Sequence, residues 1–115
     1  MNTLQNIKAK IGANMTELKT QFGIKEMALF GSYVRNEQKE QSDLDILVDF
    51  EESPTMFEFI RVENKLSKIL GVKVDLVMKN ALKPHIAKQV MQELVVLWTK
   101  HTGTILTTFL MPFKK

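Results

Sequence analysis

Residues 31–45, GSYVRNEQKEQSDLD, lie between two apolar runs, MALF before them and ILVDF after them. The stretch opens with Gly31 and Ser32 and closes, after ten intervening residues, with an Asp-x-Asp motif at Asp43 and Asp45. Because side chains alternate across a strand with period two, these two carboxylates point the same way. A glycine and a hydroxyl between a strand and a helix expose backbone amides to an anion. The stretch therefore predicts carboxylates for a divalent cation beside a cradle for phosphates, which suits chemistry on a nucleoside triphosphate.

The bulk composition is that of a globular domain. The chain has 115 residues, 44% of them hydrophobic and 25% charged, which predicts a single core. We expect one domain over residues 1–98 and an irregular or partner-dependent tail over residues 99–115. The chain contains no cysteine, which excludes a disulfide framework and a cysteine-based zinc site. The net charge of +3 is spread over scattered lysines, which argues against a dedicated nucleic-acid surface.

The sequence also bears on location. Lys8 and Lys10 interrupt the first apolar positions, so we expect no signal peptide. We expect no membrane segment either, because the apolar runs fall short of the roughly 20 residues needed to span a bilayer. These features predict a cytoplasmic protein.

Apolar spacing and turn residues predict helices and strands in alternation. Four helices are expected, at residues 3–22, from Ser32 onward, at 55–71 and at 84–98, and three strands, at 25–30, 43–50 and 72–78. The fold class that follows is α/β (α+β), with a small mixed β-sheet and helices packed on it.

A third aspartate, Asp75, interrupts the otherwise apolar strand VKVDLVM. A carboxylate inside a buried strand is unfavourable without a partner, so Asp75 requires an explanation. If its strand lies beside that of Asp45, the three aspartates converge on one sheet face. Their repulsion would raise their pKa values, and a divalent cation would reverse this effect. Taken singly, the Gly-Ser pair is as typical of a simple turn, and Asp-x-Asp of a wet strand edge. We interpret Asp49, further along the strand, as a surface residue.

These motifs together carry a family resemblance. Gly-Ser, ten residues and Asp-x-Asp resemble the signature of a minimal nucleotidyltransferase (MNT) of the DNA polymerase β-like superfamily. Members often read GSxARG where this chain reads GSYVRN, so Arg35 matches and Asn36 replaces the usual glycine. VDLV around Asp75 resembles the strand of the third carboxylate, and NALKPHIAKQVMQELVVLW resembles the closing segment. The resemblance implies a polymerase β-like nucleotidyltransferase core.

The resemblance further implies nucleotidyl transfer from ATP with Mg²⁺, in a two-ion arrangement. It assigns the catalytic and metal-binding roles to Asp43, Asp45 and Asp75, and the binding of the nucleotide phosphates to Gly31, Ser32 and Arg35. Asp75 would also orient or deprotonate the incoming hydroxyl.

The acceptor is expected to come from another protein, because the chain has no room for an acceptor-binding domain. It resembles the antitoxin of HEPN/MNT toxin–antitoxin pairs, which implies transfer of AMP to a tyrosine hydroxyl of a cognate HEPN ribonuclease toxin, within a hetero-oligomer. Two alternatives stay open. The chain could be a non-catalytic antitoxin that neutralises its partner by forming a complex, or it could modify a small-molecule hydroxyl.

Overall fold

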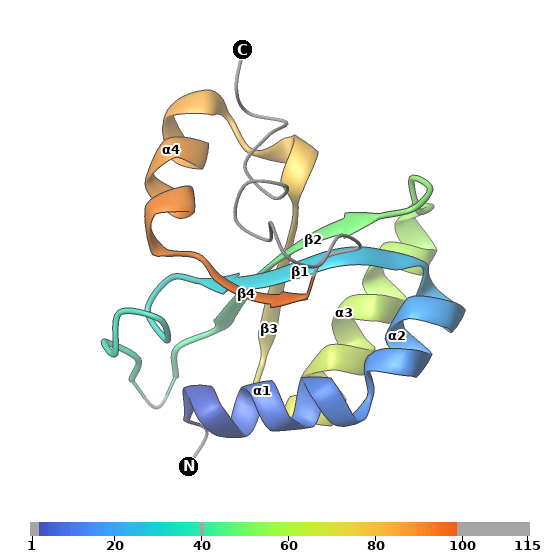
Figure 1. The fold of residues 1–115 in the computed structure, drawn as a ribbon, viewed down its shortest axis with the longest axis horizontal. Coiled ribbons are helices and arrows are strands. Elements are labelled where there is room, and N and C mark those ends of the chain that lie inside the picture. The colour runs from blue at the N-terminus through green and yellow to red at the C-terminus, as the bar shows by residue number, and fades with distance from the viewer. Residues whose placement is uncertain (1–2, 40, 99–115) are drawn as a thin grey trace.

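The computed structural model describes residues 3–39 and 41–98 (Figure 1). The tail predicted for residues 99–115 lies outside the described residues. In chain order the elements are α1 (Leu4–Ala13), α2 (Met15–Phe22), β1 (Ile24–Phe30), β2 (Leu44–Phe50), α3 (Met56–Leu70), β3 (Val74–Met78), the 3₁₀ turn η1 (Lys79–Ala81), α4 (Pro84–Glu93) and β4 (Val95–Trp98). Within these ranges, no helix has the length and apolar character needed to cross a bilayer.

The four strands form one mixed sheet in the order β3-β2-β1-β4. Strand β1 runs antiparallel to both of its neighbours, whereas β2 and β3 are parallel. Parallel strands need a long crossover connection, and α3 provides it between β2 and β3. The predicted α+β fold with a small mixed sheet is confirmed.

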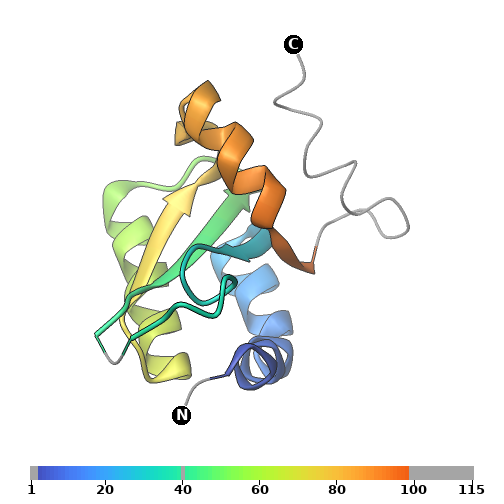
Figure 2. The same cartoon turned by 90° about the vertical axis from the view of Figure 1, so that its left-hand side faces the viewer.

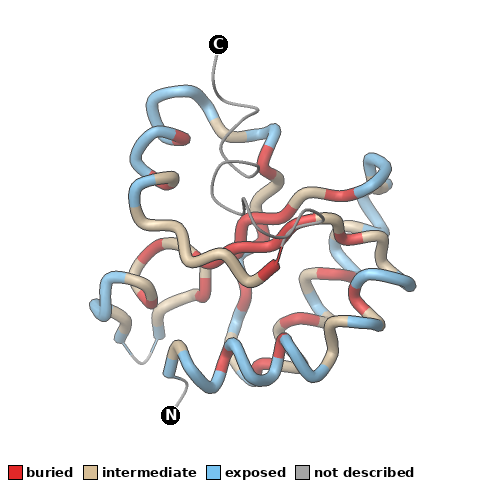
Figure 3. The backbone as a smooth tube through the Cα atoms, in the orientation of Figure 1, coloured by how far each residue is buried: buried red, intermediate tan, exposed pale blue. Residues whose placement is uncertain are grey.

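Helices cover the two faces of the sheet unequally (Figures 1 and 2). On one face α1, α2 and α3 enclose the main core, to which β2 contributes Ile46 and α3 contributes Leu66. On the other face α4 covers a smaller cluster through Val90, which packs with Leu47 of β2. The buried segments accordingly run along the centre of the sheet (Figure 3). Because side chains alternate along β2, Asp45 shares the face of Leu47 and not that of the main core.

The prediction of a single helix over residues 3–22 is wrong, because the helix is interrupted at Asn14. Asn14 has φ −110° and ψ 10°, and its side-chain amide donates to the Lys10 carbonyl (2.8 Å). Helix α2 starts afresh at the next residue. Ile11 and Met15 keep a helical spacing across the break, so apolar periodicity alone does not reveal it.

Helix α3 follows its predicted boundaries closely. The Thr55 hydroxyl accepts from the Glu58 amide (3.1 Å), and the Glu58 carboxylate accepts from the Thr55 amide (2.8 Å), which completes a capping box. Gly71 ends the helix in the left-handed conformation, with φ 72°.

The last predicted helix is too long. Helix α4 ends at Glu93, and Leu94 turns the chain into an extended conformation with ψ 135°. Residues 95–98 then form the fourth strand, β4, which pairs with β1 at the edge of the sheet. The neighbouring Val95 and Val96 favour a strand over a helix, and a free edge of β1 was available to receive them.

A buried ion pair joins η1 to the central strand β1. Lys79 Nζ lies 2.7 Å from Glu26 Oε1, and both side chains are almost completely shielded from solvent. A buried charge is tolerated only with a well-placed partner. The pair therefore anchors the segment that leads into α4.

Candidate active site

The predicted convergence of acidic residues is confirmed for Asp45 and Asp75. They face each other in register on the parallel strands β2 and β3, and a side-chain hydrogen bond joins them. The pKa of Asp45 is raised to about 6, first by burial and then by the charge of Asp75 and the hydrogen bond between the two. The charge of Asp43 adds to this effect, and that of Arg35 opposes it. Negative charge therefore accumulates at the start of these two strands.

The structure corrects the expected surroundings of Asp75. Asp75 is exposed, although its neighbours Val74 and Leu76 are buried. Asp75 shares its face of β3 with the partly buried Val77, and the partly desolvated carboxylate is that of Asp45. Asp43, predicted as the first residue of the strand, immediately precedes β2. The accessible position of Asp75 suits contact with a molecule that arrives from solvent.

The donor set of this carboxylate pair fits a hard divalent cation such as Mg²⁺. Carboxylate oxygens are its preferred protein ligands, and a cation would relieve the repulsion that raises the pKa of Asp45. Among the described residues, no three acidic or histidine side chains gather closely enough to form a complete metal site. Magnesium is commonly held by one or two carboxylates, with phosphate and water oxygens as its other ligands. The pair of Asp45 and Asp75 can therefore serve as the protein's anchor for the ion.

Gly31 lies directly against the carboxylate of Asp45. It has φ 85°, a conformation that side chains disfavour, and a methyl group added to it would overlap Asp45 Oδ2 and lie 3.0 Å from Cγ. Only glycine lets the end of β1 approach Asp45 this closely. The turn over residues 31–37, called the phosphate turn below, is thus in contact with the pair of Asp45 and Asp75.

The helix predicted to begin at Ser32 is wrong for the described residues. The chain after Gly31 forms a single turn, in which the amides of Val34 and Arg35 donate to the Gly31 carbonyl at 3.0 and 3.1 Å. The Glu37 amide closes it by donating to the Ser32 carbonyl (2.8 Å). Within the described part of the chain, the amides of Ser32 and Tyr33 donate to no acceptor. The turn therefore offers an anion backbone donors rather than a helix N-terminus.

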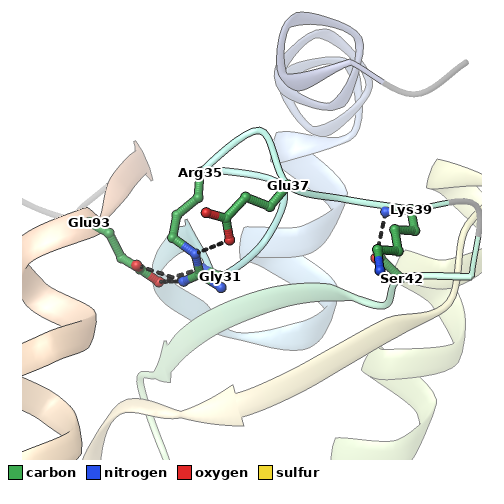
Figure 4. Close-up of polar contacts among 6 residues, drawn as sticks. All are labelled: Gly31, Arg35, Glu37, Lys39, Ser42 and Glu93. Atoms are coloured by element: carbon green, nitrogen blue, oxygen red, sulfur yellow. Dashed lines mark hydrogen bonds and ion pairs between the residues drawn. The ribbon is translucent and has the colours of Figure 1, made fainter.

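The turn also explains why Asn36 stands where the related motif has glycine. Asn36 has φ 59°, in the left-handed region. Asparagine tolerates this conformation better than other residues with a side chain. Asn36 therefore occupies a backbone conformation that glycine adopts readily. Further on, the Lys39 amide donates to Ser42 Oγ (2.7 Å), which closes the loop just before Asp43 (Figure 4).

Arg35 is held by two carboxylates (Figure 4). Its Nε donates to Glu37 Oε1 (2.9 Å), and its Nη1 donates to both oxygens of Glu93 (2.8 and 3.1 Å). The hydrogen bond with Glu37 and the contacts with Glu93 raise the pKa of Arg35 above its usual value. Arg35 is therefore part of this turn, and it can reach a phosphate, the role predicted for it, only by exchanging one of these partners.

Sequence reasoning missed Glu93. Its Oε2 accepts a hydrogen bond from the Gly31 amide (2.6 Å), although the two residues are 62 positions apart. The only local signal is its spacing three residues after Val90, which places both on one face of α4. Asp49 behaves as predicted: it is a partly exposed residue whose carboxylate lies 3.8 Å from Lys25 Nζ.

This end of the sheet combines two kinds of binding group. The carboxylates of Asp45 and Asp75 can anchor a cation, and the adjoining turn presents free amides at Ser32 and Tyr33. The combination suits a polyanionic substrate that carries its own divalent cation. The exposed Asp75 is also available to accept a proton from an incoming hydroxyl.

Comparison with known proteins adds independent findings. Residues 15–97 match the family model of the nucleotidyltransferase domain. The protein adenylyltransferase MntA of Thermococcus cleftensis is 53% identical over 95 residues, which cover 83% of this chain and 96% of that relative. A putative protein adenylyltransferase of Methanocaldococcus jannaschii is 46% identical over 96 residues, covering 83% of this chain and 98% of its own length.

Solved structures share the fold. A putative minimal nucleotidyltransferase superposes with a TM-score of 0.70 at 36% identity, covering 82% of this chain and 95% of its own. A toxin–antitoxin crystal structure with AMP-PNP gives 0.73 at 24% identity, with 92% and 82% covered. A complex of a tri-AMPylated HEPN toxin of Shewanella oneidensis with an MNT antitoxin gives 0.61 at 24% identity, with 83% and 71% covered. The last two, at this identity, establish the fold alone.

Proposed function

This chain belongs to the nucleotidyltransferase domain family, and from that premise we propose that it is an antitoxin that transfers AMP from ATP to a tyrosine hydroxyl of a HEPN-type toxin. Membership is carried by the match over residues 15–97 and by relatives that span nearly the same length. The acceptor residue, the partner and the metal are parts of the proposal.

One observation supports the chemistry above all others. Asp45 and Asp75 stand in register on parallel strands, and Gly31 of the turn lies against Asp45. A cation anchor and an anion cradle in contact are what a nucleoside triphosphate with its metal requires.

We propose that the pair of Asp45 and Asp75 anchors the metal and that Asp43, which immediately precedes β2, is a further ligand, with two Mg²⁺ ions as the expected number. Magnesium bound there would supply Lewis-acid stabilisation of the charge on the transferred phosphate. Asp45 must be ionised to bind it, and its raised pKa makes cation binding dependent on pH. The free amides of the turn, with the Ser32 hydroxyl, would hold the outer phosphates of ATP.

The proposed step is a substitution at the α-phosphorus of ATP. The acceptor oxygen forms a bond to this phosphorus, and the bond from the phosphorus to the oxygen bridging the α- and β-phosphates breaks. Pyrophosphate leaves, and the hydroxyl proton passes to Asp75, whose exposed carboxylate can meet the acceptor. AMP remains attached to the acceptor through a phosphodiester.

A HEPN toxin is the acceptor that the similar complexes favour. The tri-AMPylated toxin of Shewanella oneidensis is found with an MNT antitoxin of this fold, and the relative from Thermococcus cleftensis is described as a protein adenylyltransferase. We therefore propose a hetero-oligomer with a cognate toxin and place the reaction in the cytoplasm, where ATP is available.

The test incubates the chain with ATP, Mg²⁺ and the protein encoded by the neighbouring gene, the expected toxin, and the intact mass of that protein is measured. We expect a gain of one or more AMP units. Asp45→Ala and Asp43→Ala should abolish the gain, whereas Asp49→Ala, on the same strand, should retain it. A stable complex with no change in mass would contradict catalysis and favour neutralisation by binding.

A further inference from the structure

Glu93, the last residue of α4, contacts Gly31 and Arg35 of the phosphate turn (Figure 4). One carboxylate accepts from the Gly31 amide at 2.6 Å and from Arg35 Nη1 at 2.8 and 3.1 Å. We propose that Glu93 is the positioning residue of the phosphate turn: it sets where Gly31 and Arg35 lie, and through them how tightly ATP is bound. This inference rests on the proposed function.

The position of Glu93 is fixed by the packing of its helix. Ala87 and Val90 of α4 are buried, and Val90 packs on Leu47 at the centre of the sheet. Glu93 follows Val90 by three residues and therefore lies on the same side of the helix. The Glu93 side chain is only 18% exposed. The packing of α4 therefore holds the Glu93 carboxylate against the phosphate turn.

This placement is electrostatically unfavourable unless the turn compensates. A carboxylate at the C-terminus of a helix faces the negative end of the helix dipole, and the last turn of α4 contains no basic residue. The Arg35 guanidinium supplies the missing positive charge, and the Gly31 amide adds a hydrogen bond to the carboxylate. The Glu93 carboxylate, the Gly31 amide and the Arg35 guanidinium therefore stabilise one another in this one arrangement.

Gly31 links the position of Glu93 to that of Asp45, one of the two proposed metal ligands on β2 and β3. Its amide is bonded to Glu93, while its α-carbon lies against the carboxylate of Asp45. A displacement of Glu93 would therefore move the turn relative to Asp45. It also follows that the Gly31 amide is not available to a phosphate, so this part of the predicted cradle falls to Ser32 and Tyr33.

The test compares Glu93→Ala, Glu93→Gln and a matched control, Glu37→Ala, in the full chain. Glu37→Ala removes the other carboxylate partner of Arg35 but leaves the contact with Gly31 in place. Binding of a non-hydrolysable ATP analogue with Mg²⁺ is measured by calorimetry, and the Gly31 amide is followed by NMR. Transfer kinetics with the toxin supply KM for ATP and kcat.

We expect Glu93→Ala to weaken analogue binding about 10- to 100-fold, the range for loss of a charged hydrogen bond, with KM raised in parallel. Glu93→Gln keeps an acceptor for Gly31 and should recover part of the affinity and the Gly31 amide signal. If Glu93→Ala does not fold, Glu93→Gln alone tests the positioning role. Glu37→Ala should stay within about threefold of the wild type, since its ion pair is exposed.

Unchanged binding in both Glu93 variants would overturn the positioning role. Tighter binding would overturn it too, because it would mean that Glu93 competes with phosphate for the turn. If the wild type binds the analogue but transfers no AMP, the proposed function fails while the binding comparison still decides the role of Glu93.

Discussion

Replacing Asp45 by asparagine should raise the free energy of unfolding of the chain and abolish the proposed transfer of AMP. The pKa of Asp45 is raised to about 6 by burial and by Asp75, so ionised Asp45 destabilises the folded chain. In the unfolded chain the same carboxyl ionises near its ordinary pKa of 3.8. Between these two pKa values the folded state binds more protons, so the free energy of unfolding falls as pH rises through this window.

The size of the effect follows from the shift in pKa. It corresponds to roughly 3 kcal/mol for a fully shielded group, and solvent screening of the half-buried Asp45 reduces it to about 1–2 kcal/mol. The asparagine side chain would carry no charge, and its amide can donate to Asp75 as the protonated acid does. At about pH 8 without Mg²⁺, we expect Asp45→Asn to melt about 4–8 °C higher for each kcal/mol gained.

Thermal unfolding at several pH values checks this. The advantage of Asp45→Asn should disappear below about pH 3, where the wild-type carboxyl is protonated in both states. Adding Mg²⁺ should raise the Tm of the wild type and leave that of Asp45→Asn unchanged. Asp49→Asn is the control for replacing an aspartate on the same strand. A variant less stable than the wild type at about pH 8, or a gain independent of pH, would refute the electrostatic reasoning.

Three further substitutions probe the frame of the site. Gly31→Ala should destabilise the chain by about 1–3 kcal/mol and remove ATP binding, because its methyl group meets the Asp45 carboxylate; denaturant unfolding measures the first effect and calorimetry the second. Asn36→Val should cost about 1–2 kcal/mol in the left-handed turn, whereas Asn36→Gly should be neutral or better, and equal stability of the two in denaturant would be the contrary result. Lys79→Met should lower the free energy of unfolding by about 3–5 kcal/mol by leaving Glu26 buried without its partner, and replacing Glu26 by Gln as well should restore part of the loss.

The sequence predicted the parts of the site that depend on local rules. Strand periodicity placed Asp45 on the side away from the main core, and Gly31 stood at the turn where only glycine fits against Asp45. The register of Asp45 with Asp75 needed one further assumption, that β2 and β3 are neighbours, which α3 as a crossover makes natural.

Apart from the local break at Asn14, the failures share a physical cause, which is contact between distant segments. Strand β4 forms because β1 has an edge to receive it, and apolar spacing in residues 94–98 fits a helix equally well. Glu93 reaches Gly31 across 62 positions, so no local pattern announces the contact. The turn after Ser32 is closed by Glu37 and held by Glu93 instead of continuing as a helix, and only the folded chain brings the latter near.

The most direct test of the account follows the phosphorus atom itself. The chain, the proposed cognate toxin and Mg²⁺ are incubated with ATP labelled on either the α- or the γ-phosphate, and label on the toxin is measured after denaturing electrophoresis. Nucleotidyl transfer predicts that α-label is retained on the toxin, that γ-label is released as pyrophosphate, and that Asp45→Asn abolishes both outcomes. Retention of γ-label, or labelling that survives Asp45→Asn, would contradict the proposal that the Asp45–Asp75 pair directs transfer of AMP.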